Sequence, residues 1–113
     1  MAKPQKPDTR VLPRPDTGKD ERTRKAPLYH VILHDDDKHT YEYVIRMLMQ
    51  LFGMTAEQAY QHAREVDTSG VTIVDTTTLE RAELKRDQIR AFGADPLIHN
   101  SPGSMSATVE PAD

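Results

Sequence analysis

The sequence predicts a small α+β domain in which strands and helices follow one another in the order βααβαβ. Three observations predict it. A short apolar run at residues 29–34 gives way to apolar residues at helical spacing over residues 40–52. Gly53 and Gly70 stand where two helices would end. The folded part is confined to residues 29–99, so 113 residues allow one small domain.

Both ends of the chain are poor in large apolar residues. Most of the eight prolines lie in residues 1–28, where Val11 and Leu12 are almost the only large apolar side chains. Such a segment buries too little surface to offset the entropy of ordering it. We therefore expect residues 1–28 to be a disordered N-terminal extension. A Ser-Pro-Gly-Ser cluster from Ser101 predicts that residues 100–113 are a flexible C-terminal tail.

The first two elements are a strand and a helix. Residues 29–34 are β-branched and apolar, as in a short buried strand. The helix begins at His39 or Thr40 and ends at Phe52, because Gly53 provides a stop. Its apolar side chains recur at helical spacing: Val44, Met47, Leu48, Leu51 and Phe52.

Two capping boxes place the next helices. Thr55 and Gln58 open a helix that ends before Gly70, and residues 71–75 form the second strand. The apolar face of that helix consists of Ala59, Ala63 and Val66. Thr77 and Glu80 open a third helix that runs to about Phe92, with a thin apolar face of Leu79, Ala82, Ile89 and Phe92. The last strand is expected at residues 96–99, with Pro96 at its start or on a sheet edge.

Charge and composition exclude several classes of protein. Residues 1–28 carry eight basic and four acidic side chains, whereas residues 29–113 carry seven basic and fourteen acidic ones. An acidic body does not suit phosphate binding, so we expect neither nucleic acid nor a membrane as partner. The absence of cysteine excludes disulfides and Cys-based zinc sites. No signal-peptide core or membrane span is visible, and we expect a cytoplasmic protein.

The acidic run from His34 to His39 is the main candidate for chemistry. A strand that leads into a helix can present Asp35, Asp36 and Asp37 as a site for a cation, either an amine or a metal ion. Successive strand residues point to opposite faces, however, and the run lacks the spacing and glycine of a calcium loop. The simpler alternative is that these aspartates, Asp37 above all, cap the helix that follows. No catalytic motif is present.

The run Tyr29-His-Val-Ile-Leu-His-Asp-Asp-Asp, followed by Glu42-Tyr-Val-Ile, resembles the ClpS family, the adaptors that bring N-degron substrates to the Clp AAA+ protease. That family usually reads Val-Leu-x-Asn-Asp-Asp and then Met-Glu-Phe-Val. Further matches are Phe52-Gly53-Met54, Ala59, Val66, Gly70, Ala82-Glu83-Leu84-Lys85 and Pro96-Leu97. The resemblance covers nearly all of residues 29–98. It implies a three-stranded antiparallel sheet packed against three helices.

The resemblance also implies a monomeric binding module that needs no cofactor or metal and catalyses no reaction. Its partners would be N-degron substrates and the N-terminal domain of a Clp AAA+ unfoldase. Carried over by position, the site for the substrate's α-amino group is Asp35, Asp36, Asp37 and Asp67. The pocket for its first side chain is Ile32, His39, Tyr41, Val44, Ala63, Val66 and Leu97. Docking on the unfoldase would use Glu80 and Lys85.

Four positions depart from the family pattern. Asp35 replaces an Asn, Asp67 replaces a His, and Tyr41 and Ala63 each replace a Met. Two functions therefore follow from the resemblance. The first is an adaptor that binds a free α-amino group with a bulky apolar first residue and delivers the substrate to the unfoldase. The alternative is a regulatory paralogue that docks on a AAA+ unfoldase and modulates it without recognising N-degrons.

Overall fold

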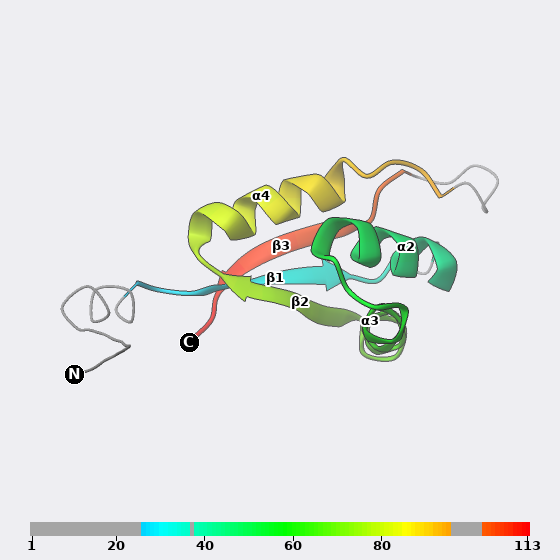
Figure 1. The fold of residues 1–113 in the computed structure, drawn as a ribbon, viewed down its shortest axis with the longest axis horizontal. Coiled ribbons are helices and arrows are strands. Elements are labelled where there is room, and N and C mark those ends of the chain that lie inside the picture. The colour runs from blue at the N-terminus through cyan, green and yellow to red at the C-terminus, as the bar shows by residue number, and fades with distance from the viewer. Residues whose placement is uncertain (1–25, 37, 96–102) are drawn as a thin grey trace, which may run out of the picture.

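The computed structural model describes residues 26–36, 38–95 and 103–113. Six elements follow along the chain, namely β1 (Tyr29–His34), α2 (Tyr41–Phe52), α3 (Ala56–Ser69), β2 (Val71–Thr77), α4 (Leu79–Arg90) and β3 (Ser106–Pro111). The predicted order βααβαβ is confirmed, and so is a three-stranded antiparallel sheet packed against three helices (Figure 1). No helix in the described ranges is long and apolar enough to cross a membrane.

β1 is the central strand of the sheet, whose order is β2-β1-β3. Both neighbours run antiparallel to it, with His34 opposite Val71 on one side and Ser106 on the other. The pairing with β2 shifts between Val31 and Ile32, which marks a bulge. The strand that carries the acidic run is therefore held on both edges, and this fixes the position of the residues that follow it.

The position predicted for the third strand was wrong. Residues 96–99 lie outside the described residues, and the strand that pairs with β1 is Ser106–Pro111, within the segment expected to be a flexible tail. Met105 and Ala107 are buried in the core, which anchors the start of the strand. Arg90 secures it further by donating to the Ala107 carbonyl from Nε and Nη2, at 3.1 and 2.8 Å.

Local hydrogen bonds fix where the helices begin. The capping box of Thr55 and Gln58 is confirmed, with bonds of 3.0 and 3.1 Å. The cap of α4 is Thr78 rather than Thr77, since β2 continues through Thr77. Thr40 caps α2 by accepting from the Tyr43 N–H at 3.1 Å. The predicted capping by Asp37 falls on a residue outside the described ones.

Glycines end the first two helices as the sequence predicts. Gly53 follows α2 with φ of 68°, and Gly70 follows α3 with φ of 87°. Both values lie in the left-handed region, which costs glycine little because it has no Cβ. The tight stop at Gly70 turns the chain from α3 directly into β2.

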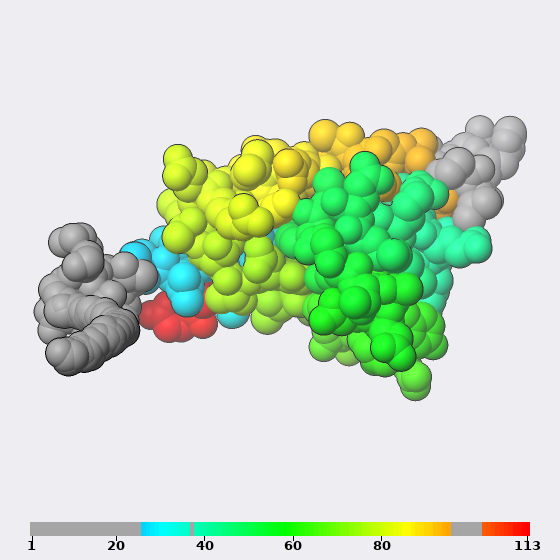
Figure 2. All heavy atoms as spheres, viewed as in Figure 1, coloured from blue at the N-terminus to red at the C-terminus, as the bar shows by residue number. Residues whose placement is uncertain are grey.

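One apolar core lies between the sheet and the helices. The sheet contributes Val31, Leu33, Val74 and Ala107, while the helices contribute Tyr43, Val44, Met47, Leu48, Ala59, Ala63, Val66, Ala82 and Ile89. In Figure 1, α4 runs along β3 and β1, whereas α2 and α3 lie together at the end of the sheet where β1 finishes. The side chains of α2 and α3 merge into one continuous surface there (Figure 2). The acidic run thus leads into the α2–α3 end of the molecule.

Candidate functional site

The acidic run turns sharply after β1 and is tied to α3. The Asp35 N–H donates to the Gly70 carbonyl at 2.9 Å, so the end of β1 is bonded to the residue that ends α3. Asp67 lies three residues before Gly70 on the same helix. The backbone at Asp35 is therefore held beside the end of the helix that carries Asp67. Asp37, the remaining aspartate of the predicted amine site, lies outside the described residues.

Asp36 and His39 form an ion pair within this turn. The Asp36 carboxylate accepts from the Lys38 N–H at 2.9 Å and lies 2.8 Å from His39 Nδ1. Burial opposes ionisation of Asp36, but the hydrogen bonds from His39 and from the Lys38 N–H outweigh it and lower the pKa of Asp36 below its usual value. Asp36 is thus a carboxylate held ionised by its neighbours.

His39 is a structural centre of the turn. Its side chain is only 1 % exposed, and its ring lies 4.5 Å from the ring of Tyr43. Nε2 faces the Gly103 carbonyl at 2.5 Å, while Nδ1 faces Asp36. His39 therefore fastens the acidic run to the chain that leads into β3.

Tyr41 and Asp67, two predicted site residues, are in direct contact. The Tyr41 hydroxyl donates to Asp67 Oδ2 at 2.8 Å, and this bond raises the pKa of the hydroxyl. The contact joins the first turn of α2 to the last turn of α3. The Tyr41 ring also lies 5.8 Å from the ring of Tyr60 on α3. Both partners of this hydrogen bond are exposed, so a polar ligand from solvent can compete for it.

The predicted apolar pocket comes together only in part. Val44, Ala63 and Val66 lie in one buried cluster, between α2 and α3. Ile32 is not a member of this cluster, whereas its neighbour Leu33 is. Ile32 is nevertheless buried, so its place in the pocket stays a prediction. Leu97 lies outside the described residues.

Comparison with known proteins identifies the family. The model of the ATP-dependent Clp protease adaptor protein ClpS matches residues 24–97. The chain belongs to the ClpS family. A ClpS adapter protein of Synechococcus elongatus is 35% identical over 99 residues, covering 84% of this chain and 93% of the relative. One from Roseobacter denitrificans is 34% identical over 85 residues, covering 75% and 72%.

A solved structure has the same fold as this ClpS-family chain. Agrobacterium tumefaciens ClpS2, bound to L-phenylalaninamide, superimposes with a TM-score of 0.67 at 23% sequence identity. The match covers 77% of this chain and 99% of the other. Members of the ClpS family are adaptors of the Clp protease rather than enzymes. The partner is accordingly a Clp protease with its AAA+ unfoldase.

The two predicted docking residues of this ClpS adaptor have different surroundings. Glu80 is exposed in the first turn of α4. Lys85 is half-buried, and its Nζ donates to the Leu51 carbonyl at 2.6 Å and lies 5.3 Å from the centre of the Phe52 ring. Lys85 therefore stabilises the C-terminal end of α2, where carbonyl groups lack helical partners. Glu80 has the exposure that a docking contact requires.

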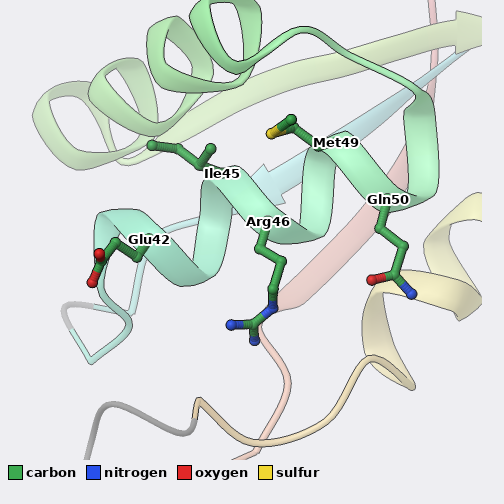
Figure 3. Close-up of a pocket in the computed structure, with 5 residues that line it drawn as sticks. All are labelled: Glu42, Ile45, Arg46, Met49 and Gln50. Atoms are coloured by element: carbon green, nitrogen blue, oxygen red, sulfur yellow. The ribbon is translucent and has the colours of Figure 1, made fainter.

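The sequence did not single out a hollow on the outer side of α2 in this ClpS adaptor. It has a volume of about 440 Å³ and is lined by Glu42, Ile45, Arg46, Met49 and Gln50. Figure 3 shows Ile45 and Met49 projecting from one side of the helix, and Arg46 and Gln50 from the other. The signal that could have revealed it is the pair Ile45 and Met49, which are four residues apart and outside the predicted apolar face.

A metal site is not formed by the described part of this ClpS chain. Across residues 26–36, 38–95 and 103–113, no three His, Asp or Glu side chains are grouped closely enough to hold an ion. The described residues around Asp36 instead use their polar groups on one another.

Proposed function

We propose that this ClpS-family protein binds the free α-amino group and the bulky apolar first side chain of N-degron substrates and delivers them to a Clp AAA+ unfoldase. The family supports the adaptor role. The related ClpS2 is bound to L-phenylalaninamide, which carries a free α-amino group next to an aromatic side chain. A ligand of this kind needs an anionic acceptor beside an apolar pocket.

One observation supports the amine site most strongly: the backbone at Asp35 is bonded to the end of α3, the helix that carries Asp67. Asp35 is bonded through its N–H to Gly70 at the end of α3, and Asp67 lies one helical turn earlier. The Asp67 carboxylate already accepts a hydrogen bond from Tyr41 at 2.8 Å. An α-ammonium group offers three donors and a positive charge, so it competes well for this acceptor. Val44, Ala63 and Val66 supply the apolar surface of the first-residue pocket.

The same contact favours a second candidate function. Tyr41 engages Asp67, and Val44, Ala63 and Val66 are buried in the core. A protein that docks on a AAA+ unfoldase and modulates it needs no open pocket. Asp35 and Asp67, which replace the neutral or titratable groups of the family pattern, are compatible with that function too.

Labelled peptides that differ only at their first residue distinguish the two candidates. We expect fluorescence anisotropy to show binding of peptides that begin with free Leu, Phe, Tyr or Trp. N-acetylation removes the charge that the carboxylates face, and breaking such a pair costs about 2–5 kcal/mol, or roughly 30-fold or more in affinity. Equal binding of free and acetylated peptides, together with retained binding to the unfoldase, would establish the second function instead.

The remaining features of the proposal concern assembly. We propose that the protein acts in the cytosol as a monomer and docks on the N-terminal domain of the unfoldase through α4. Glu80 supports this docking face, since it is charged and exposed on that helix. Co-purification of the unfoldase domain with wild type but not with Glu80→Lys tests this part separately from peptide binding.

A further inference from the structure

We propose that an apolar row on α2, formed by the exposed Tyr41 and Met49 and the half-buried Ile45 between them, binds the third and fifth residues of an extended substrate N-terminus. We call this row the α2 stripe. The inference rests on the function proposed above, because it takes the substrate's amino group to lie near Asp67. It adds a second region of recognition beyond the first-residue pocket, on the outer surface of the helix.

The α2 stripe is separate from the side of α2 that builds the core. Tyr43, Val44, Met47 and Leu48 are buried against the rest of the domain. The stripe residues are spaced four apart, which places them in one row along another side of the helix. Tyr41 is 36 % exposed and Met49 is 42 % exposed, and Tyr60 of α3, at 42 %, extends the row beside Tyr41. Tyr41 and Met49 thus remain exposed after folding, whereas Ile45 is half-buried and packs partly against the core.

The surface next to the stripe is a shallow depression of about 440 Å³ that is open to solvent and lies along α2 alone. Side chains of a peptide can lie against it without entering an enclosed cavity. Ile45 and Met49 form one wall, and Arg46 and Gln50 project from the opposite side (Figure 3). The Arg46 guanidinium lies 5.7 Å from the centres of both the Tyr43 and the Phe92 rings, which holds its stem against the protein. The exposed face of α2 thus has apolar side chains along one side and polar side chains along the other.

Tyr41 makes the stripe continuous with the proposed amine site. Its hydroxyl is bonded to Asp67, while its ring is the first member of the stripe. A peptide whose amino group lies near Asp67 therefore leaves the pocket beside Tyr41. Continuity of this kind favours the substrate's own chain as the occupant, rather than a separate partner.

The spacing of the stripe matches an extended peptide. Residues four apart on a helix are separated by about 6 Å along its axis. Alternate residues of an extended strand lie on one side, separated by about 6.6 Å. If the first side chain enters the pocket by Tyr41, the third residue lies at Ile45 and the fifth at Met49. Apolar side chains at these two positions would be buried, and those at the second and fourth would face water.

Two peptide isomers test this register. Both begin with a free Phe in a Gly-Ser background, one with Leu at positions three and five and the other with Leu at positions two and four. By anisotropy we expect the first to bind about tenfold more tightly, from partial burial of two apolar side chains. In Met49→Gln the advantage should fall to about threefold or less. Leu84→Gln, at a 51 % exposed position on α4, is the matched control and should retain it.

The outcomes separate this inference from the function on which it rests. If free peptides bind and acetylated ones do not, but both Leu isomers bind equally, the stripe is not a recognition surface and the N-degron function remains. If the advantage persists unchanged in Met49→Gln, the apolar preference arises elsewhere and the inference is wrong. If acetylation makes no difference to any peptide, the proposed function fails and the inference fails with it.

Discussion

Two contacts at the same edge of the molecule use a carboxylate in different ways. Asp36 pairs with His39, whose side chain is almost completely buried, and His39 also reaches Gly103. Asp67 accepts from Tyr41 where both side chains are exposed. The family resemblance assigns both aspartates to one amine site. Their surroundings show that the first contact holds the fold together, whereas a ligand can compete for the second.

Removal of His39 should have the largest effect on stability. His39→Ala removes the side chain that contacts both Asp36 and the Gly103 carbonyl, and it opens a space beside Tyr43. We expect the free energy of unfolding to fall by about 2–4 kcal/mol, measured by chemical denaturation. His30→Ala is the control, since the hydrogen bond from His30 to Thr76 is exposed and should contribute less than about 1 kcal/mol. Equal losses of unfolding free energy in His39→Ala and His30→Ala would contradict the structural role of His39.

Lowering the pH should weaken the contact between Asp36 and His39. The native pKa of Asp36 is lower than its usual value of 3.8, so the unfolded chain takes up this proton first as the pH falls. The contribution to stability is therefore complete above the unfolded pKa and is lost as the pH falls through the native one. The melting temperature of wild type should therefore decrease as the pH is lowered below about 4. Asp36→Asn should reduce that dependence, and an unchanged profile would show that other groups cause it.

On α4, Lys85 makes a contact that holds the fold together, whereas Glu80 is exposed and available for binding. Lys85→Met removes the donor to the Leu51 carbonyl, and we expect a loss of about 1–2 kcal/mol in unfolding free energy. Glu80→Lys should change stability by less than about 0.5 kcal/mol, because exposed charges contribute little. Binding to the unfoldase, measured by co-purification, should fall in Glu80→Lys. If Lys85→Met is as stable as wild type, its contact with α2 has no structural role.

Much of this fold could be predicted because local signals agree with the tertiary structure. The capping box at Thr55 and the glycine stops at Gly53 and Gly70 are short-range features, and each appears where the sequence predicts it. β3 could not be found this way. Ser106–Pro111 is made largely of small and polar residues, and it becomes a strand because β1, at the other end of the chain, provides its partner. A pairing so distant in sequence leaves no local signal.

The candidate site, too, could be predicted from the sequence only in part. The resemblance placed Tyr41 and Asp67 near each other, and the structure joins them at 2.8 Å. It could not show that His39 is buried, because that depends on Gly103 and the segment leading into β3. The α2 stripe was missed for another reason: apolar residues on the outer side of a helix are identified only once its buried side is known.

Removal of the Tyr41 hydroxyl should have a small effect on stability and the most informative effect on binding. Tyr41→Phe removes an exposed hydrogen bond to Asp67 and keeps the aromatic ring, so the free energy of unfolding should change little. In wild type, an incoming ammonium group must displace the Tyr41 hydroxyl from Asp67. In Tyr41→Phe this displacement is not needed. Affinity for free N-terminal peptides should therefore rise by about two- to fivefold, as measured by anisotropy. Asp67→Asn, which removes the negative charge, should lower affinity by about tenfold and more strongly at low salt. If Tyr41→Phe instead weakens binding, the hydroxyl contacts the ligand directly, and Tyr41 is part of the bound site rather than a competitor for Asp67.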